Sequence, residues 1–117
     1  MNFDEAVAAH SAWKRRLSAY IAKRDDSLNA DEVSQDRKCS LGRWIYGEGV
    51  RYCGMPAFAA LKKEHALFHC AAANVIRKAD SGQSVPEELA VGSGSEFMSA
   101  SSKVVLAIME MKKQAGS

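Results

Sequence analysis

Apolar residues recur every three or four positions over residues 2 to about 24, which is the spacing of one helix face. Asn2 stands where an N-cap is expected, and Glu5 follows three positions later, as in a capping box. The stripe predicts a first amphipathic helix, and His10 lies on its apolar face. Its members are Phe3, Val7, His10, Leu17 and Ile21.

A second stripe spans residues 55 to 79 and is the longest uninterrupted helical pattern in the chain. Pro56 falls in the first turn, where its missing N–H costs nothing, and Gly82 closes the pattern. The buried positions include His65, and His69 follows one turn later. The stripe consists of Phe58, Leu61, His65, Phe68, Ala72 and Ala79.

Residues 86 to 113 are also helical in pattern, but residues 92–95 read Gly-Ser-Gly-Ser and interrupt them. The sequence leaves open whether this region is one helix or two. Pro86 opens it, and a clear stripe follows from Ser95 onward. That stripe consists of Phe97, Ser101, Ile108 and Met111.

Residues 25–38 are polar and aperiodic, which predicts a loop with at most one short turn. After it, Ser40 can cap a short helix that runs through Tyr46 and ends at Gly47. The prediction is an all-α fold, an antiparallel bundle of four main helices plus one short helix carrying Trp44. Residues 1–117 form a single domain in this reading.

Composition and charge exclude several classes of function. A net charge of +2 is too small to indicate binding to nucleic acid or to an anionic membrane surface. No stretch approaches the ~20 apolar residues of a membrane span, and the acidic, amphipathic N-terminus is unlike a signal peptide. An odd number of cysteines, three, predicts a reducing compartment, and we expect a cytoplasmic location.

The candidate chemistry is a metal site. His65 and His69, four apart, leave one face of a helix and can close on one ion. His10 adds a third imidazole from an inward face, and Cys39 lies where a helix begins, which favours its thiolate. Three nitrogen donors and one sulfur donor suit tetrahedral zinc. The hypothesis is therefore one Zn(II) per chain.

The alternative is a metal-free helical interaction or scaffold module, because a single histidine on an apolar stripe is usually a hydrogen-bonded core residue. A small zinc hydrolase ranks below both. A fourth protein ligand closes the metal shell, no His-Glu-x-x-His motif occurs, and no nucleophile–base pair is present. We therefore predict that the chain is not an enzyme. Cys53, in a loop, and Cys70, about 100° around the helix from His69, are expected to stay off the metal.

Three motifs together resemble the chemoreceptor zinc-binding (CZB) domain family over nearly the whole chain, including Ser95-x-Phe97-x-x-x-Ser101. The motifs are His10-x-x-Trp13-Lys14, Cys39-x-Leu41-Gly42-x-Trp44-Ile45-Tyr46-Gly47-x-Gly49 and His65-x-x-x-His69. The resemblance implies a zinc held by His10, Cys39, His65 and His69 inside a helical bundle. It also implies a homodimer that regulates a chemoreceptor or a diguanylate cyclase. Neither a methyl-accepting coiled coil nor a cyclase domain accompanies the domain in this sequence.

Two functions are compatible with a closed zinc site. It is either purely structural or a sensor of zinc level or of oxidants. We favour the sensor, because Cys39 is the one oxidisable ligand and its loss would weaken zinc binding and shift helix packing. The signal would leave through the first and last helices to a signalling protein, in the same chain or in another.

Overall fold

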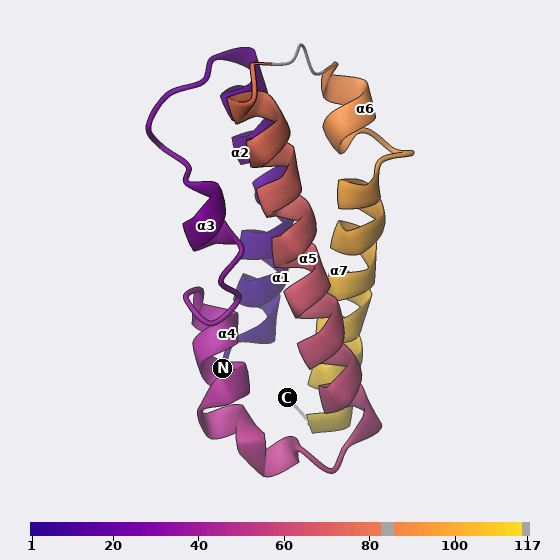
Figure 1. The fold of residues 1–117 in the computed structure, drawn as a ribbon. Helices are drawn as coiled ribbons and strands as arrows, with labels where there is room; N and C mark the ends of the chain where they lie inside the picture. Colours follow the sequence, from indigo (N-terminus) through magenta and orange to yellow (C-terminus); the bar gives the residue numbers. More distant parts are fainter. Residues whose placement is uncertain (83–85, 116–117) are drawn as a thin grey trace.

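The computed structural model describes residues 1–82 and 86–115, and these are helical almost throughout (Figure 1). No strand occurs within the two described ranges, so the prediction of an all-α helical bundle is confirmed. The elements are α1 (Phe3–Ser11), α2 (Trp13–Ala22), α3 (Ala30–Val33), α4 (Ser40–Tyr46), the 3-10 helix η1 (Glu48–Tyr52), α5 (Pro56–Asp80), α6 (Glu87–Val91) and α7 (Glu96–Ala115).

The long helix α5 is the centre of the bundle, and α7 packs along it in the opposite direction (Figure 1). α1 packs on α7, and α2 packs on α5 and runs in the same direction as α5. α2 and α5 can be parallel only because the chain between them returns to the other end of the bundle. Residues 23–55 make this return, and we call them the crossover; it carries α3, α4 and η1 along one side of α5.

The first predicted helix is two helices that meet at Ala12. This residue keeps helical dihedral angles (φ −69°, ψ −19°), so α2 continues the path of α1. The expected cap is present, because the Asn2 side chain accepts a hydrogen bond of 3.0 Å from the N–H of Glu5. The region from 86 onward, which the sequence left open, is two helices separated at residues 92–95.

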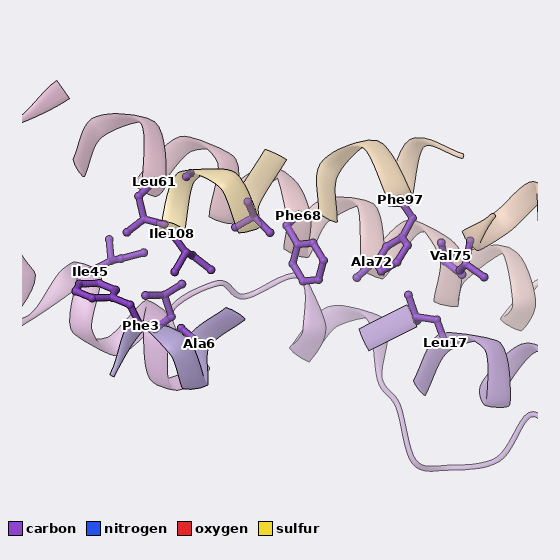
Figure 2. Close-up of a cluster of buried hydrophobic side chains, with 14 of the residues drawn as sticks. Phe3, Ala6, Leu17, Ile45, Leu61, Phe68, Ala72, Val75, Phe97 and Ile108 are labelled. Atoms are coloured by element: carbon purple, nitrogen blue, oxygen red, sulfur yellow. The ribbon is translucent and has the colours of Figure 1, made fainter. Parts of the chain in front are cut away.

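The core is continuous along α5 and lies on both sides of Phe68 (Figure 2), which stands between His65 and His69 in the sequence. On one side Leu61 packs with residues of α1, α4 and α7, and on the other Ala72 and Val75 lie near Leu17 of α2. Phe68 sits between the two groups and is fully buried. The apolar stripe of α5 therefore holds a polar pair in the middle of the core, where its position is set by packing on every side.

Side chains at one end of the bundle fix how α2 and α5 are aligned. Tyr20 at the end of α2 donates a 2.5 Å hydrogen bond to Asp80 at the end of α5. Arg24 donates to the last carbonyls of α5, those of Ala79 and Asp80, each at 3.1 Å. α2 and α5 thus end at the same level.

Gly42 allows the chain at Asp36 and Arg37 to lie against the first turn of α4. A Cβ atom at this position would come within 1.7 Å of the carbonyl oxygen of Asp36. The Cys-x-Leu-Gly motif therefore needs its glycine for a close backbone approach.

We predict that Gly42→Ala destabilises the metal-free protein by about 3 kcal/mol, the upper end of what overpacking costs. The matched control is Gly54→Ala, because a Cβ at Gly54 would meet no described atom within 4 Å. The free energies of unfolding from urea titrations check this. Equal stability of the two variants would mean that the backbone of Asp36 does not approach α4 so closely.

Candidate metal centre

Four side chains that are distant in sequence converge inside the bundle: His10, Cys39, His65 and His69. Each offers one ligand atom, and these atoms all lie within 4.8 Å of one another. They include every histidine of the chain. The imidazoles are 0–3% exposed, whereas Cys39 is half-buried. The structure thus brings together all four residues that the sequence marked as ligands.

α5 supplies two of the four donors from successive turns. The Nε2 atoms of His65 and His69 are 3.1 Å apart, as expected for side chains on one helix face. The Nδ1 atom of His69 lies 2.9 Å from the carbonyl oxygen of Val33, in α3. The crossover therefore holds one ring of α5 from outside the helix.

α1 supplies the third imidazole. The Nδ1 atom of His10 lies 2.8 Å from the carbonyl oxygen of Ala6, one turn earlier in the same helix. Its ring packs against Phe68, with the ring centroids 5.2 Å apart. His10 is thereby fixed by its own helix and by the core.

Cys39 enters from the crossover, and it is the N-cap of α4, a role that the sequence analysis gave to Ser40. Its Sγ atom accepts a hydrogen bond of 3.3 Å from the N–H of Gly42. The same Sγ lies 3.1 Å from Nε2 of His65 and 3.6 Å from Nε2 of His69. The helix start therefore aims the sulfur at the two rings of α5.

The hydrogen bonds to the imidazoles decide which nitrogens face the cluster. Carbonyl oxygens only accept hydrogen bonds, so Nδ1 of His10 and of His69 carries the proton. The Nε2 atom of each ring then bears an unprotonated lone pair. Nε2 of His10 is buried and has no hydrogen-bond partner in the described part of the chain. Buried lone pairs that face one another and a thiol are favourable around a cation. The residues present therefore fit a metal ion.

Burial also sets the protonation states that metal binding needs. It lowers the pKa of His65 to about 2 and lowers the pKa of His10 and of His69, so all three rings are neutral at neutral pH. Burial raises the pKa of the Cys39 thiol, against the opposite effect of the N–H groups of Gly42 and Leu41. The thiolate expected from the helix start is therefore disfavoured by burial, and a bound cation would restore it.

The donor set is three imidazoles and one sulfur, which matches a closed tetrahedral zinc site. Cys53 and Cys70, predicted to stay off the metal, are both exposed and lie outside the cluster. Trp44 packs on Phe3, with the ring centroids 5.3 Å apart. It holds the start of α1 against α4.

Sequence reasoning missed Asp36. One carboxylate oxygen of this residue lies 3.8 Å from Nδ1 of His65. Asp36 belongs to the polar segment that the sequence predicts as a loop. No rule of residue spacing relates a position in this segment to a position in α5. The backbone carbonyls of Ala6 and Val33 carry no sequence signal at all.

A model of one protein family, described as the chemoreceptor zinc-binding domain, matches residues 10–76. This range is more than half of the chain and contains all four clustered residues. The chain belongs to this family. No curated protein and no solved structure matches the chain significantly.

Family membership and the cluster together are consistent with one zinc ion per CZB domain. None of the described helices is long and apolar enough to cross a membrane.

Buried neutral imidazoles make the stability of the metal-free CZB domain depend on pH. The unfolded chain binds protons near pH 6.5, whereas His65 in the folded protein binds one only near pH 2. Between these values the unfolded state holds more protons, so the free energy of unfolding falls as the pH falls. The contribution of His65 alone approaches about 1.4 kcal/mol per pH unit well below pH 6.5, and it amounts to about 1.4 kcal/mol in total between pH 7.5 and 5.5.

Urea titrations of chelator-treated protein between about pH 7.5 and 5.5 measure this slope, and His65→Asn should reduce it. An unfolding free energy that is the same at both ends of the range would show that the rings are not buried in the neutral form.

Proposed function

We propose that this CZB domain is a regulatory zinc module in which His10, Cys39, His65 and His69 hold one Zn(II). The observation that supports it is the convergence of four matched donors, with two Nδ1–H groups already held by backbone carbonyls. That arrangement presents Nε2 lone pairs to a cation before it arrives. Bound zinc would link α1, the crossover and α5, and so contribute to folding.

We infer that the module is not catalytic. Four protein donors fill a tetrahedral shell, whereas a catalytic zinc keeps a position open for water. Among the described residues, Asp36 is the one carboxylate within 4 Å of a ring nitrogen, and it approaches the outer nitrogen of His65. A carboxylate on that side of a ligand orients the ligand and does not activate a metal-bound water.

Cys39 is the ligand through which we propose regulation. Two surface hollows, of about 250 and 500 Å³, reach Cys39, and it is the one clustered residue that lines both. His65 lines neither hollow. The Cys39 thiolate attacks one oxygen of a peroxide, the O–O bond breaks and the second oxygen leaves as hydroxide or, once protonated, as water. The sulfenic acid so formed is a poorer zinc ligand.

Loss of this ligand would release the crossover rather than α5. Cys39 caps α4, so a change at its sulfur also removes the hydrogen bond that begins this helix. A shift of the crossover would reach α1 through Trp44, which packs on Phe3. α1 in turn packs on α7, so that both terminal helices respond.

The output partner we propose is a second copy of the domain and a signalling protein of the chemoreceptor or diguanylate cyclase type. α7 exposes Leu106 (65%) and Met109 (55%), large apolar side chains that a helical partner would cover. Residues beyond the family match complete the same bundle, because α7 packs along α5. We therefore treat the chain as one domain, and its free thiols support a cytoplasmic location.

Two alternatives stay distinct from this proposal. A metal-free helical scaffold would leave buried, unpaired ring nitrogens as a permanent cost of about 1–3 kcal/mol each. A purely structural zinc site would bind the ion but would not release it when the thiol is oxidised. The two predictions below separate them.

We predict that purified protein takes up one zinc per chain and that Cys39→Ala weakens binding by more than about 100-fold, above the usual effect of losing an outer contact. Co²⁺-loaded wild type should show tetrahedral transitions and a thiolate charge-transfer band, and the variant should lack that band. Cys70→Ala, next to His69 but exposed, is the matched control and should retain both. A wild type that takes up no metal contradicts the zinc proposal.

The sensor proposal predicts that hydrogen peroxide releases zinc from a Cys53→Ala/Cys70→Ala variant, in which Cys39 is the one thiol left. A chromogenic chelator follows the zinc, and circular dichroism follows the helices. Zinc that stays bound while Cys39 becomes oxidised, or a Cys39 that does not react, would overturn oxidant sensing and leave a structural site or a sensor of zinc level.

A further inference from the structure

The three imidazoles of the cluster differ in how their outer nitrogens are held. Nδ1 of His10 faces the carbonyl of Ala6, and Nδ1 of His69 faces that of Val33. Nδ1 of His65 is buried and has no hydrogen-bond partner in residues 1–82 and 86–115. His65 is also the most deeply buried of the three, with 0% of its surface exposed.

A carboxylate, that of Asp36, lies close to this nitrogen. Its Oδ2 lies 3.8 Å from Nδ1 of His65, longer than a hydrogen bond but within the reach of a small side-chain rotation. The Asp36 side chain is 17% exposed, so it is itself mostly withdrawn from water. A carboxylate in this environment needs a cationic or hydrogen-bonding partner.

Two features place Asp36 at this distance. Tyr46, at the end of α4, donates a 2.8 Å hydrogen bond to the same Oδ2 atom. Gly42, in the first turn of α4, lets the backbone of Asp36 approach more closely than any side chain would allow. Both residues lie in the short helix that Cys39 caps, so one helix positions the sulfur ligand and the carboxylate together.

We propose that Asp36 is the positioning residue of His65, accepting the Nδ1–H of this ring when the site holds zinc. This inference rests on the zinc-binding function proposed above. It gives each of the three imidazoles an outer acceptor, two from backbone carbonyls and one from a carboxylate. The closing of the 3.8 Å gap to about 2.8 Å forms a charge-assisted hydrogen bond.

The carboxylate also balances the charge of the site. Zn²⁺ with one thiolate and three neutral imidazoles carries a net charge of +1, in a core with little water. One further negative charge nearby makes the whole assembly neutral, and Asp36 supplies it at an outer position. A carboxylate that accepts from the outer nitrogen also makes the inner nitrogen a better donor to the metal.

The test compares four variants by competition with a zinc chelator, each measured as folded metal-free protein. Asp36→Ala removes the acceptor and its charge, and we expect zinc affinity to fall by about 10–100-fold. Asp36→Asn keeps an acceptor oxygen without the charge and should fall less. Tyr46→Phe removes the Tyr46–Asp36 hydrogen bond but keeps the carboxylate, so its loss of affinity should be smaller than that of Asp36→Ala. Asp31→Asn, in α3 and paired on the surface with Arg77, is the charge-matched control and should bind as wild type does.

A spectroscopic readout separates positioning from stability. In zinc-loaded wild type, the imidazole Nδ1–H protons of His10, His65 and His69 should all be protected from solvent exchange in NMR spectra. In zinc-loaded Asp36→Ala only the His65 signal should exchange rapidly, because the other two acceptors are backbone carbonyls.

The outcomes distinguish this inference from the function on which it rests. A wild type without zinc affinity would overturn the proposed function. A wild type that binds zinc, with Asp36→Ala no weaker than Tyr46→Phe or with a His65 Nδ1–H still protected, would overturn the role of Asp36 alone.

Discussion

Three imidazoles meet in the interior of this bundle with nitrogen lone pairs turned toward one another and toward a thiol. In an ordinary helical core the same volume would be filled by leucine or phenylalanine, at no cost in polar desolvation. Each buried nitrogen without a partner costs about 1–3 kcal/mol, and burial keeps the rings neutral. A bound cation would offset this desolvation cost by coordinating the ring nitrogens, and the surrounding fold is consistent with such binding. The helices do not merely enclose the cluster, because α1, the crossover and α5 each contribute a donor.

The donors are held with unequal firmness. His65 and His69 stand in the middle of α5, with Phe68 buried beside them. Cys39 stands at the first turn of a helix of seven residues, in a crossover that depends on the close approach at Gly42. The two ligands in the long helix α5 are therefore held more firmly than Cys39, which caps the short helix α4. This asymmetry supports our proposal that the zinc site is a regulatory element and that Cys39 is its responsive ligand.

Helical periodicity was enough to predict the all-α bundle and the inward positions of His10, His65 and His69, because one apolar stripe sets both. The spacing of His65 and His69 predicted their common face. Periodicity could not predict the crossover: a polar segment with the four-residue helix α3 has no stripe, so neither the contact of Val33 with His69 nor the place of Asp36 could be derived from it. The cap of α4 was assigned to Ser40 because hydroxyl caps are common, whereas the sulfur of Cys39 fills that role. The pKa of Cys39 was likewise misjudged, since the effect of the helix start is visible in sequence and the burial of the thiol is not.

The central claim is that one zinc ion is bound by three imidazole nitrogens and one thiolate from these four residues. X-ray absorption at the zinc edge of the loaded protein measures that shell directly. The account predicts about three nitrogen neighbours at about 2.0–2.1 Å and one sulfur neighbour at about 2.3 Å, with total coordination of four. A shell without sulfur, a shell with two or more sulfur atoms, or a six-coordinate shell of light atoms would contradict it.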